Sequence, residues 1–255
     1  MPEIHAAGPL EKHGLPPWRL LTATGALALG MAAAPALAAP GIGDEVYGAT
    51  VEPGEVELEA RFGQLAGGDA GGENNFRLEA GYGVNGHLRV ATVAEFEREA
   101  PDSSHLTHVG IEAVYNLARV GGIDVAAYGE YEQGFHGDSD GLEAKLLLER
   151  RTRLWDLRLN LIAEKPLDAA ESVELGYAAS ADVAVADGAR LGVTAFGELG
   201  GFRHFLPYAE HYVGPTATFR VRPAHLRAET GYLFAFGKAH DETRGQWRLN
   251  LEFEL

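Results

Sequence analysis

The chain has 255 residues, of which 46% are hydrophobic and 23% are charged. This composition is ordinary for a folded protein and too polar for a membrane protein built from helices. Lys and Arg number 21 against 37 Asp and Glu, so the formal charge is −16, and an acidic surface argues against a nucleic-acid partner. The absence of cysteine excludes a disulfide framework and a lipid-modified cysteine.

The N-terminus carries the pattern of a secretory signal peptide. Arg19 precedes a short apolar core over residues 20–29, and Ala36-Leu37-Ala38 supplies small residues at a cleavage site. We therefore expect residues 1–38 to be a signal peptide that is removed on export. The alternative is an uncleaved membrane anchor, which the shortness of the apolar core disfavours. Residues 39–54 are expected to form a periplasmic N-terminal segment, and the sequence leaves open whether they plug the barrel.

From residue 55 to residue 255 the sequence alternates polar and apolar residues with a period of two. In the final stretch, Trp247, Leu249 and Leu251 alternate with polar neighbours, which in a β-strand places the two kinds on opposite faces. The pattern and its turn residues predict about twelve strands. Their expected ranges are 55–64, 75–84, 87–98, 105–117, 123–132, 142–151, 153–164, 173–185, 190–199, 211–221, 226–236 and 246–255.

The connections between these strands alternate in length. Tight turns such as Asn85-Gly86 and Asp187-Gly188 follow the even strands, and longer loops follow the odd ones. Outer-membrane barrels combine short periplasmic turns, long external loops and an even strand number. The sequence therefore predicts an all-β, antiparallel, up-and-down transmembrane β-barrel. A soluble β-sandwich also alternates but gives no reason for sorted loops, and counts of ten or fourteen strands remain open.

Aromatic residues support this arrangement of the strands. Tyr82, Tyr115 and Trp155 fall near the expected periplasmic ends of strands, whereas Phe96, Phe234 and Trp247 fall near the external ends. Aromatic side chains prefer the boundary between membrane and water, so the sequence predicts two aromatic girdles around the barrel.

With these features, the chain and its closing Leu251-Glu252-Phe253-Glu254-Leu255 resemble a Gram-negative outer-membrane β-barrel. Residues 46–58 and 157–165 are similar to barrels grouped near the phenol-degradation-pathway transporter-like family. The resemblance implies a place in the bacterial outer membrane, contact with its lipid and lipopolysaccharide, and insertion by the barrel-assembly machinery. It carries over no catalytic residues. Leu255 differs from the aromatic residue with which such barrels usually end.

The inward face of the expected barrel carries about twice as many acids as bases, so a wet lumen would favour cations. The alternative is that Arg–Glu pairs fill the lumen and stabilise it, because about twelve strands lie between side-chain-filled and water-filled barrels. The candidates for selectivity are Glu95, Glu112, Glu130, Asp156, Arg77, Arg89, Arg158 and Arg220.

The expected external loops contain a second group of candidates, His136, Asp138, Asp140, Arg203 and His204. Imidazole and carboxylate groups there could bind a metal, but their spacings match no metal motif, and solvated loop residues explain them better. No Ser–His pair appears on the lipid face, which disfavours an outer-membrane hydrolase and leaves it as the third alternative. We expect no enzyme and no cofactor.

The sequence thus predicts a channel for passive transport of an unidentified small solute. The alternative is a closed structural, adhesive or envelope-sensing barrel that acts through its external loops.

Overall fold

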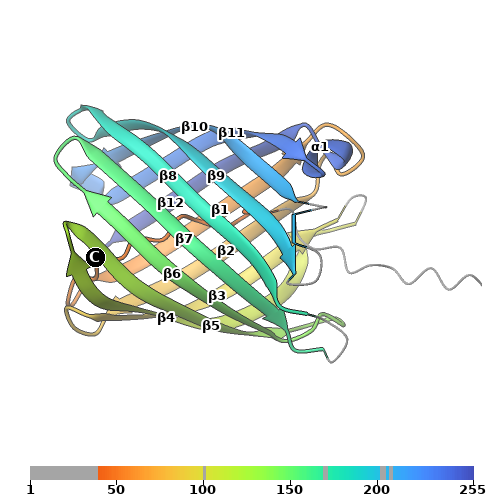
Figure 1. The fold of residues 1–255 in the computed structure, drawn as a ribbon, viewed down its shortest axis with the longest axis horizontal. Coiled ribbons are helices and arrows are strands. Elements are labelled where there is room, and N and C mark those ends of the chain that lie inside the picture. Colours follow the sequence, from red (N-terminus) through yellow and green to blue (C-terminus); the bar gives the residue numbers. More distant parts are fainter. Residues whose placement is uncertain (1–39, 100–101, 169–171, 202–204, 207–208) are drawn as a thin grey trace, which may run out of the picture. The chain divides into compact units, whose positions relative to one another are not determined.

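The computed structural model describes residues 40–99, 102–168, 172–201, 205–206 and 209–255, so the expected signal peptide lies outside the described residues. The described residues form twelve strands that close into one antiparallel barrel (Figure 1). The strands are β1 (Val56–Ala66), β2 (Asn74–Gly83), β3 (Leu88–Arg98), β4 (His105–Val120), β5 (Ile123–Gly134), β6 (Gly141–Arg151), β7 (Trp155–Pro166), β8 (Glu174–Ala186), β9 (Ala189–Gly201), β10 (Glu210–Val221), β11 (Leu226–Gly237) and β12 (Gly245–Glu254).

Each strand pairs with its neighbours in sequence, and β12 closes the barrel against β1. The register of this last pair runs from Glu57 opposite Glu254 to Ala66 opposite Gly245. Closure leaves no strand edge with unpaired backbone groups. The predicted fold class is confirmed, and so is the count of twelve strands. Apart from the barrel there are two short helices, the 3-10 helix η1 (Arg222–Ala224) and α1 (Ala239–Glu242). No helix among the described residues has the length and apolar character needed to cross a bilayer.

The period of two separates an apolar outer surface from a polar interior. In β12, Trp247 and Leu249 are exposed on the outside, whereas Arg248 and Asn250 are buried on the inside. In the same way, Leu78 of β2 is exposed while Arg77 and Glu79 are buried. The outer surface also carries exposed aromatic side chains towards both strand ends, among them Tyr82, Tyr115, Trp155, Phe219, Phe234 and Trp247.

The two ends of the barrel differ in their connections. At one end, here called the turn end, β2–β3, β4–β5, β6–β7, β8–β9 and β10–β11 are joined by short turns, and the C-terminus lies there (Figure 1). Asn85 explains one such turn, because its side-chain oxygen accepts hydrogen bonds from the backbone N–H groups of His87 and Leu88. At the other end, the loop end, the connections are longer and include α1.

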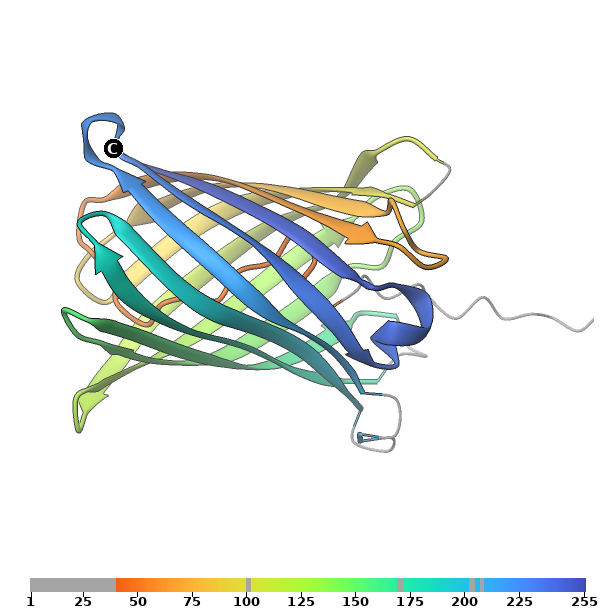
Figure 2. The same cartoon turned by 90° about the horizontal axis from the view of Figure 1, so that it is seen from above.

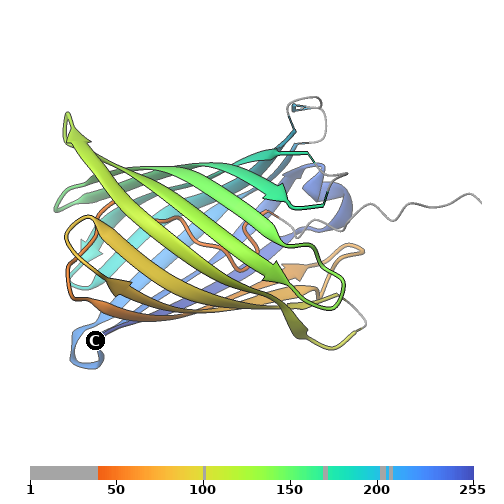
Figure 3. The same cartoon turned by 90° about the horizontal axis from the view of Figure 1, so that it is seen from below.

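Residues 40–54, which we call the lumenal segment, lie inside the barrel and form no strand (Figures 2 and 3, in orange). The segment begins beside Gln246 near the loop end and reaches the rim of the turn end, where Gly54 N–H donates to the Gly83 carbonyl at 2.7 Å. That residues 39–54 form a periplasmic segment stays a prediction, whereas in the structure residues 40–51 lie within the barrel and residues 52–54 are exposed at its rim. The physical reason is that polar side chains of the interior satisfy the backbone of this segment.

The apolar outer surface generates a prediction about stability in lipid. Leu161→Arg, in the middle of β7, should lower the free energy of unfolding from lipid vesicles by about 2–4 kcal/mol, because arginine is poorly solvated in hydrocarbon. Leu154→Arg, in the turn before β7, is the matched control and should cost about 0–1 kcal/mol. Urea titration of vesicle-bound protein measures both values, and equal costs would contradict a lipid-facing outer surface.

Candidate functional site

The lumenal segment is held mainly through its backbone. Asn160 of β7 makes two hydrogen bonds to Tyr47: its Oδ1 accepts from the backbone N–H at 2.8 Å, and its Nδ2 donates to the carbonyl at 3.0 Å. Two residues further on, Glu149 accepts from the Ala49 N–H at 2.9 Å and Asn116 donates to the Ala49 carbonyl at 2.7 Å. Side chains from β4, β6 and β7 thus take the place of a neighbouring strand.

The first half of the segment is bound in the same manner. Gln246 donates to the Pro40 carbonyl at 3.0 Å, and Arg158 donates to the Val46 carbonyl at 3.0 Å. Arg248 donates to two carbonyls, those of Gly41 and Asp44. Every buried backbone group that finds such a partner avoids the cost of losing its hydrogen bonds to water.

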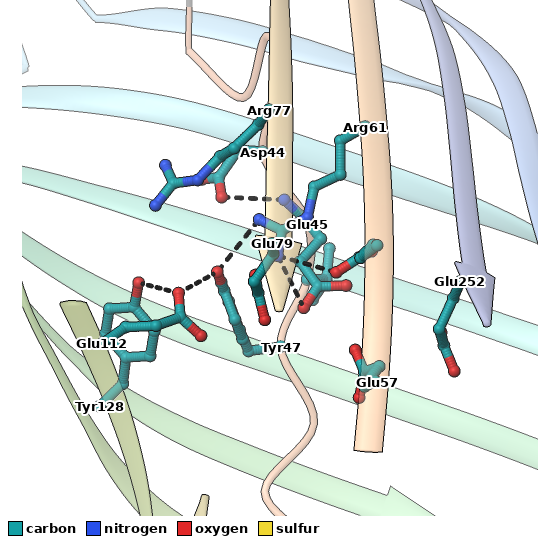
Figure 4. A network of polar contacts seen from close by, with 12 residues as sticks. Asp44, Glu45, Tyr47, Glu57, Arg61, Arg77, Glu79, Glu112, Tyr128 and Glu252 are labelled. Atoms are coloured by element: carbon teal, nitrogen blue, oxygen red, sulfur yellow. Dashed lines mark hydrogen bonds and ion pairs between the residues drawn. The ribbon is translucent and has the colours of Figure 1, made fainter. Parts of the chain in front are cut away.

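The side chain of Tyr47 makes several contacts with the wall of the barrel (Figure 4). Its hydroxyl donates to Glu112 Oε2 at 2.9 Å and accepts from Arg61 at 3.1 Å. Its ring lies 4.7 Å from the ring of Tyr128, and the Lys145 ammonium lies 4.5 Å from the Tyr47 ring centroid. Tyr47 is therefore fixed by hydrogen bonds, ring packing and cation–π contact together.

Asp44 links the segment to the wall by charge. Its carboxylate lies 3.6 Å from Lys145 Nζ, and Lys145 also pairs with Glu143 at 2.9 Å. The segment therefore adds a carboxylate to the ion pairs of the wall.

The wall around Tyr47 is a dense network of ion pairs. Arg61 contacts Glu59 and Glu79, and Arg89 contacts Glu79 and Glu112. Glu57, Glu59 and Glu79 lie close enough together to be considered as metal ligands. The guanidinium groups of Arg61 and Arg89 already supply positive charge to these carboxylates, so the cluster is best described as a network of charge-assisted hydrogen bonds.

An apolar cluster fills part of the lumen towards the loop end. Ile42 and Val46 of the segment pack in one buried cluster with Phe196, Tyr212 and Leu233, which point inward from β9, β10 and β11. Gly41 lies so close to this wall that an added Cβ would be 2.1 Å from the Phe196 ring. Hydrophobic periodicity does not reveal such contacts, because the segment that these side chains pack against is distant in sequence.

The turn end of the lumen contains a cavity of about 540 Å³. The segment forms one side through Glu45, Tyr47 and Thr50, and charged side chains of the wall form the rest. Among the wall residues, Arg227 pairs with Glu252 at 2.6 Å and Arg220 pairs with Glu254 at 3.0 Å. The cavity is thus polar and of a size that suits a small solute.

Each of the eight selectivity candidates takes part in an ion pair of the barrel. Glu95, Glu130 and Arg77 form one group, in which Arg77 contacts Glu130 at 2.5 Å and Glu95 at 3.8 Å. Glu112 and Arg89 pair at 2.8 Å, and Asp156 and Arg158 pair at 3.2 Å. Arg220 lies apart from these groups near the turn end, with half of its side chain exposed. Their role in selectivity remains a prediction.

The loop candidates do not converge on one site. The His136 ring contacts the His105 ring edge-on at 5.6 Å between centroids, and Asp138 lies in the same loop with an exposed side chain. Asp140 instead accepts hydrogen bonds from the Tyr131 hydroxyl at 2.8 Å and the Gly134 N–H at 3.1 Å. Arg203 and His204 lie outside the described residues.

The sequence left open whether residues 39–54 plug the barrel, and it did not show the partners of this segment in the wall. The segment has no strand periodicity. Its partners in the wall are polar side chains, which are expected at any position that faces the lumen. A usable signal was the set of amide side chains facing inward, Asn116, Asn160 and Gln246, because such groups can both donate to and accept from a peptide.

The sequence matches no known family model and no curated protein. Its structure is similar to the NanC porin, with a TM-score of 0.58 and 11% identity over 78% of this chain and 100% of that one. The KdgM porin gives a TM-score of 0.56 and 9% identity over 78% and 99%, respectively. An outer membrane channel from Pseudomonas putida F1 gives 0.55 and 12% over 80% and 96%. These likenesses show that the chain has the fold of an outer-membrane porin.

The Tyr47 network predicts the effect of removing one hydroxyl. Tyr47→Phe should lower the hydrogen-exchange protection of amides in residues 45–50 by about tenfold or more, because a buried carboxylate and a buried guanidinium each lose a partner. Tyr82→Phe, on the outer surface, is the control and should change nothing in this segment. Unchanged protection in Tyr47→Phe would show that the segment does not depend on this contact.

Asp140 predicts a pH dependence in its loop. The hydrogen bond from Tyr131 and then that from Gly134 N–H hold the pKa of Asp140 below its ordinary value of 3.8. Because the pKa is lowered, the ionised carboxylate stabilises the loop at pH values above the ordinary pKa. This stabilisation is lost as the pH falls through the lowered pKa. Tyr131→Phe should therefore move the pKa of Asp140 up towards 3.8 in a carboxyl NMR titration. The Tyr82→Phe variant should leave the titration of Asp140 as it is, and an identical titration in Tyr131→Phe would refute the assignment.

Proposed function

We propose that this protein is an outer-membrane channel for small polar solutes in which the lumenal segment limits the pore. The observation that carries the proposal is a closed barrel, apolar outside and charged inside, that retains a 540 Å³ polar cavity beside the segment. The likeness of the fold to porins and to an outer membrane channel supports the same reading.

The outer surface supports a location in the outer membrane. Exposed leucines and valines along the strands suit hydrocarbon, and exposed aromatic side chains near both strand ends suit the two boundaries with water. The turn end would then face the periplasm and the loop end the outside. This location implies export by a cleaved signal peptide, insertion by the barrel-assembly machinery, and contact with lipid and lipopolysaccharide.

The arrangement of carboxylates supports a preference for cations. Near the loop end, the register places Glu164 opposite both Glu143 and Glu174, and it places Glu198 opposite Glu210. Like charges directly opposite one another repel, so this part of the wall gains from a passing cation. The candidates Glu112 and Glu130 suit the role less well, because each is buried in contacts with arginine and tyrosine.

One observation favours the alternative of a closed barrel. The segment and the apolar cluster around Phe196 fill part of the lumen with buried side chains, which would stop solutes unless the segment moves. A closed barrel would act through its loops, as an adhesive or envelope-sensing protein, and its ion pairs would serve stability alone.

Single-channel recording in planar bilayers separates the two functions. The channel account predicts current steps with a cation-selective reversal potential in a salt gradient. Glu164→Gln combined with Glu174→Gln should move that potential towards zero, because two carboxylates that attract cations are neutralised. Asp187→Asn, in an exposed turn at the other end, is the matched control and should keep the selectivity. Silence from protein whose folding is verified would favour the closed barrel.

A further inference from the structure

We propose that the lumen is a binding track for extended peptides and that the lumenal segment occupies it as an internal substitute for such a ligand. The inference rests on the proposed channel function and names its solute class, oligopeptides. It is carried by the contacts that the wall makes with the backbone of the segment.

Side chains of the wall form hydrogen bonds with peptide groups along most of the segment. Donors from Gln246, Arg248, Arg158, Asn160 and Asn116 meet carbonyl oxygens from Pro40 to Ala49. Acceptors on Asn160 and Glu149 meet the N–H groups of Tyr47 and Ala49. Residues 40–43 form a turn with Gly41 and Gly43 at positive φ. Past this turn, carbonyl acceptors with N–H donors set between them are the chemistry of an extended polypeptide.

The pairing at Asn160 shows this most directly. Its amide group donates to and accepts from the same residue, Tyr47, as a residue in a neighbouring strand would do. Such a contact recognises the main chain and is indifferent to the side chain. Asn160 is fully buried beneath the segment, so a peptide that replaced the segment would have to supply the same hydrogen-bond partners.

The track selects for small residues at two places. Gly41 and Gly43 present only backbone, and an added Cβ at either would lie 2.1 Å from a side chain of the wall. Ile42, Val46 and Tyr47 fill buried apolar sites of the lumen. A different peptide with glycines and apolar residues at these places would therefore meet the same track.

The barrel does not depend on the segment for closure. All twelve strand pairings are made among β1 to β12, and the segment belongs to none of them. The segment leaves the lumen at residues 52–54, which are exposed at the rim of the turn end. Its release would leave backbone-binding side chains facing an intact lumen.

The test replaces the segment with a peptide supplied from outside. A protease recognition sequence is inserted between Glu52 and Pro53, the full chain is folded with its segment in place, and the segment is then cut and washed out. Mass spectrometry verifies its loss. Fluorescence anisotropy next measures binding of a labelled peptide with the sequence of residues 40–51. A shuffled peptide of the same composition that keeps its glycines, isoleucine, valines and tyrosine in place, and a copy methylated on the tyrosine and alanine amide nitrogens, are compared with it.

The proposal expects the first peptide to bind the cut barrel and the uncut barrel to bind none. The shuffled peptide should bind within about tenfold of it, whereas methylation of the two amides should weaken binding about tenfold or more, because each loses a hydrogen bond to a buried acceptor. Equal binding of the methylated peptide, or no binding to the emptied barrel, would overturn the proposal.

Two variants keep the test decisive. If the cut segment stays in place, a chain lacking residues 40–50 takes the role of the emptied barrel, with its folding checked by its heat-dependent mobility on gels. Asn160→Asp keeps the acceptor and loses the donor, so it should weaken binding, whereas Tyr82→Phe, on the outer surface, should not. Because binding is measured without current, a barrel that conducts but binds no peptide refutes this inference and leaves the proposed channel intact.

Discussion

Charge inside a narrow barrel has to be paired, and this requirement organises the whole interior. A carboxylate or guanidinium taken out of water loses several kcal/mol of hydration unless hydrogen-bonded partners replace it. Here Arg61, Arg77 and Arg89 each contact more than one carboxylate, and Tyr47 and Tyr128 add hydroxyls to the same network. The strands can face lipid on one side only because the other side is satisfied in this way.

The lumenal segment also supplies partners to the buried charges of the wall. It brings Asp44 to Lys145, the Tyr47 hydroxyl to Glu112, and a run of carbonyls to Arg248 and Arg158. Without the segment these cations would face a lumen with fewer acceptors, and water or a solute would have to take its place. The contacts that hold the segment are therefore the contacts that a ligand would inherit.

The fold could be predicted from the sequence because its signals are local. Alternation in stretches such as Trp247 to Phe253 fixes which face is apolar, and Asn85-Gly86 fixes a turn, without any knowledge of distant residues. The position of residues 40–54 could not be predicted in this way. Pro40 meets Gln246 206 residues away and Tyr47 meets Asn160 113 residues away, and neither contact leaves a trace in the periodicity. Likewise, the sequence makes Glu112 a candidate for selectivity, but in the structure it is hydrogen-bonded to Tyr47 of the segment and to Arg89.

The most direct measurement is the conductance of one protein before and after its lumenal segment is cut at the exposed residues 52–54. Recording the same inserted molecules in a planar bilayer, with protease added from the side that the turn end faces, removes differences between preparations. The account predicts small current steps from the intact protein and a lasting increase after cutting and washing, because the obstruction leaves the lumen. A conductance that stays the same after verified loss of the segment would contradict it.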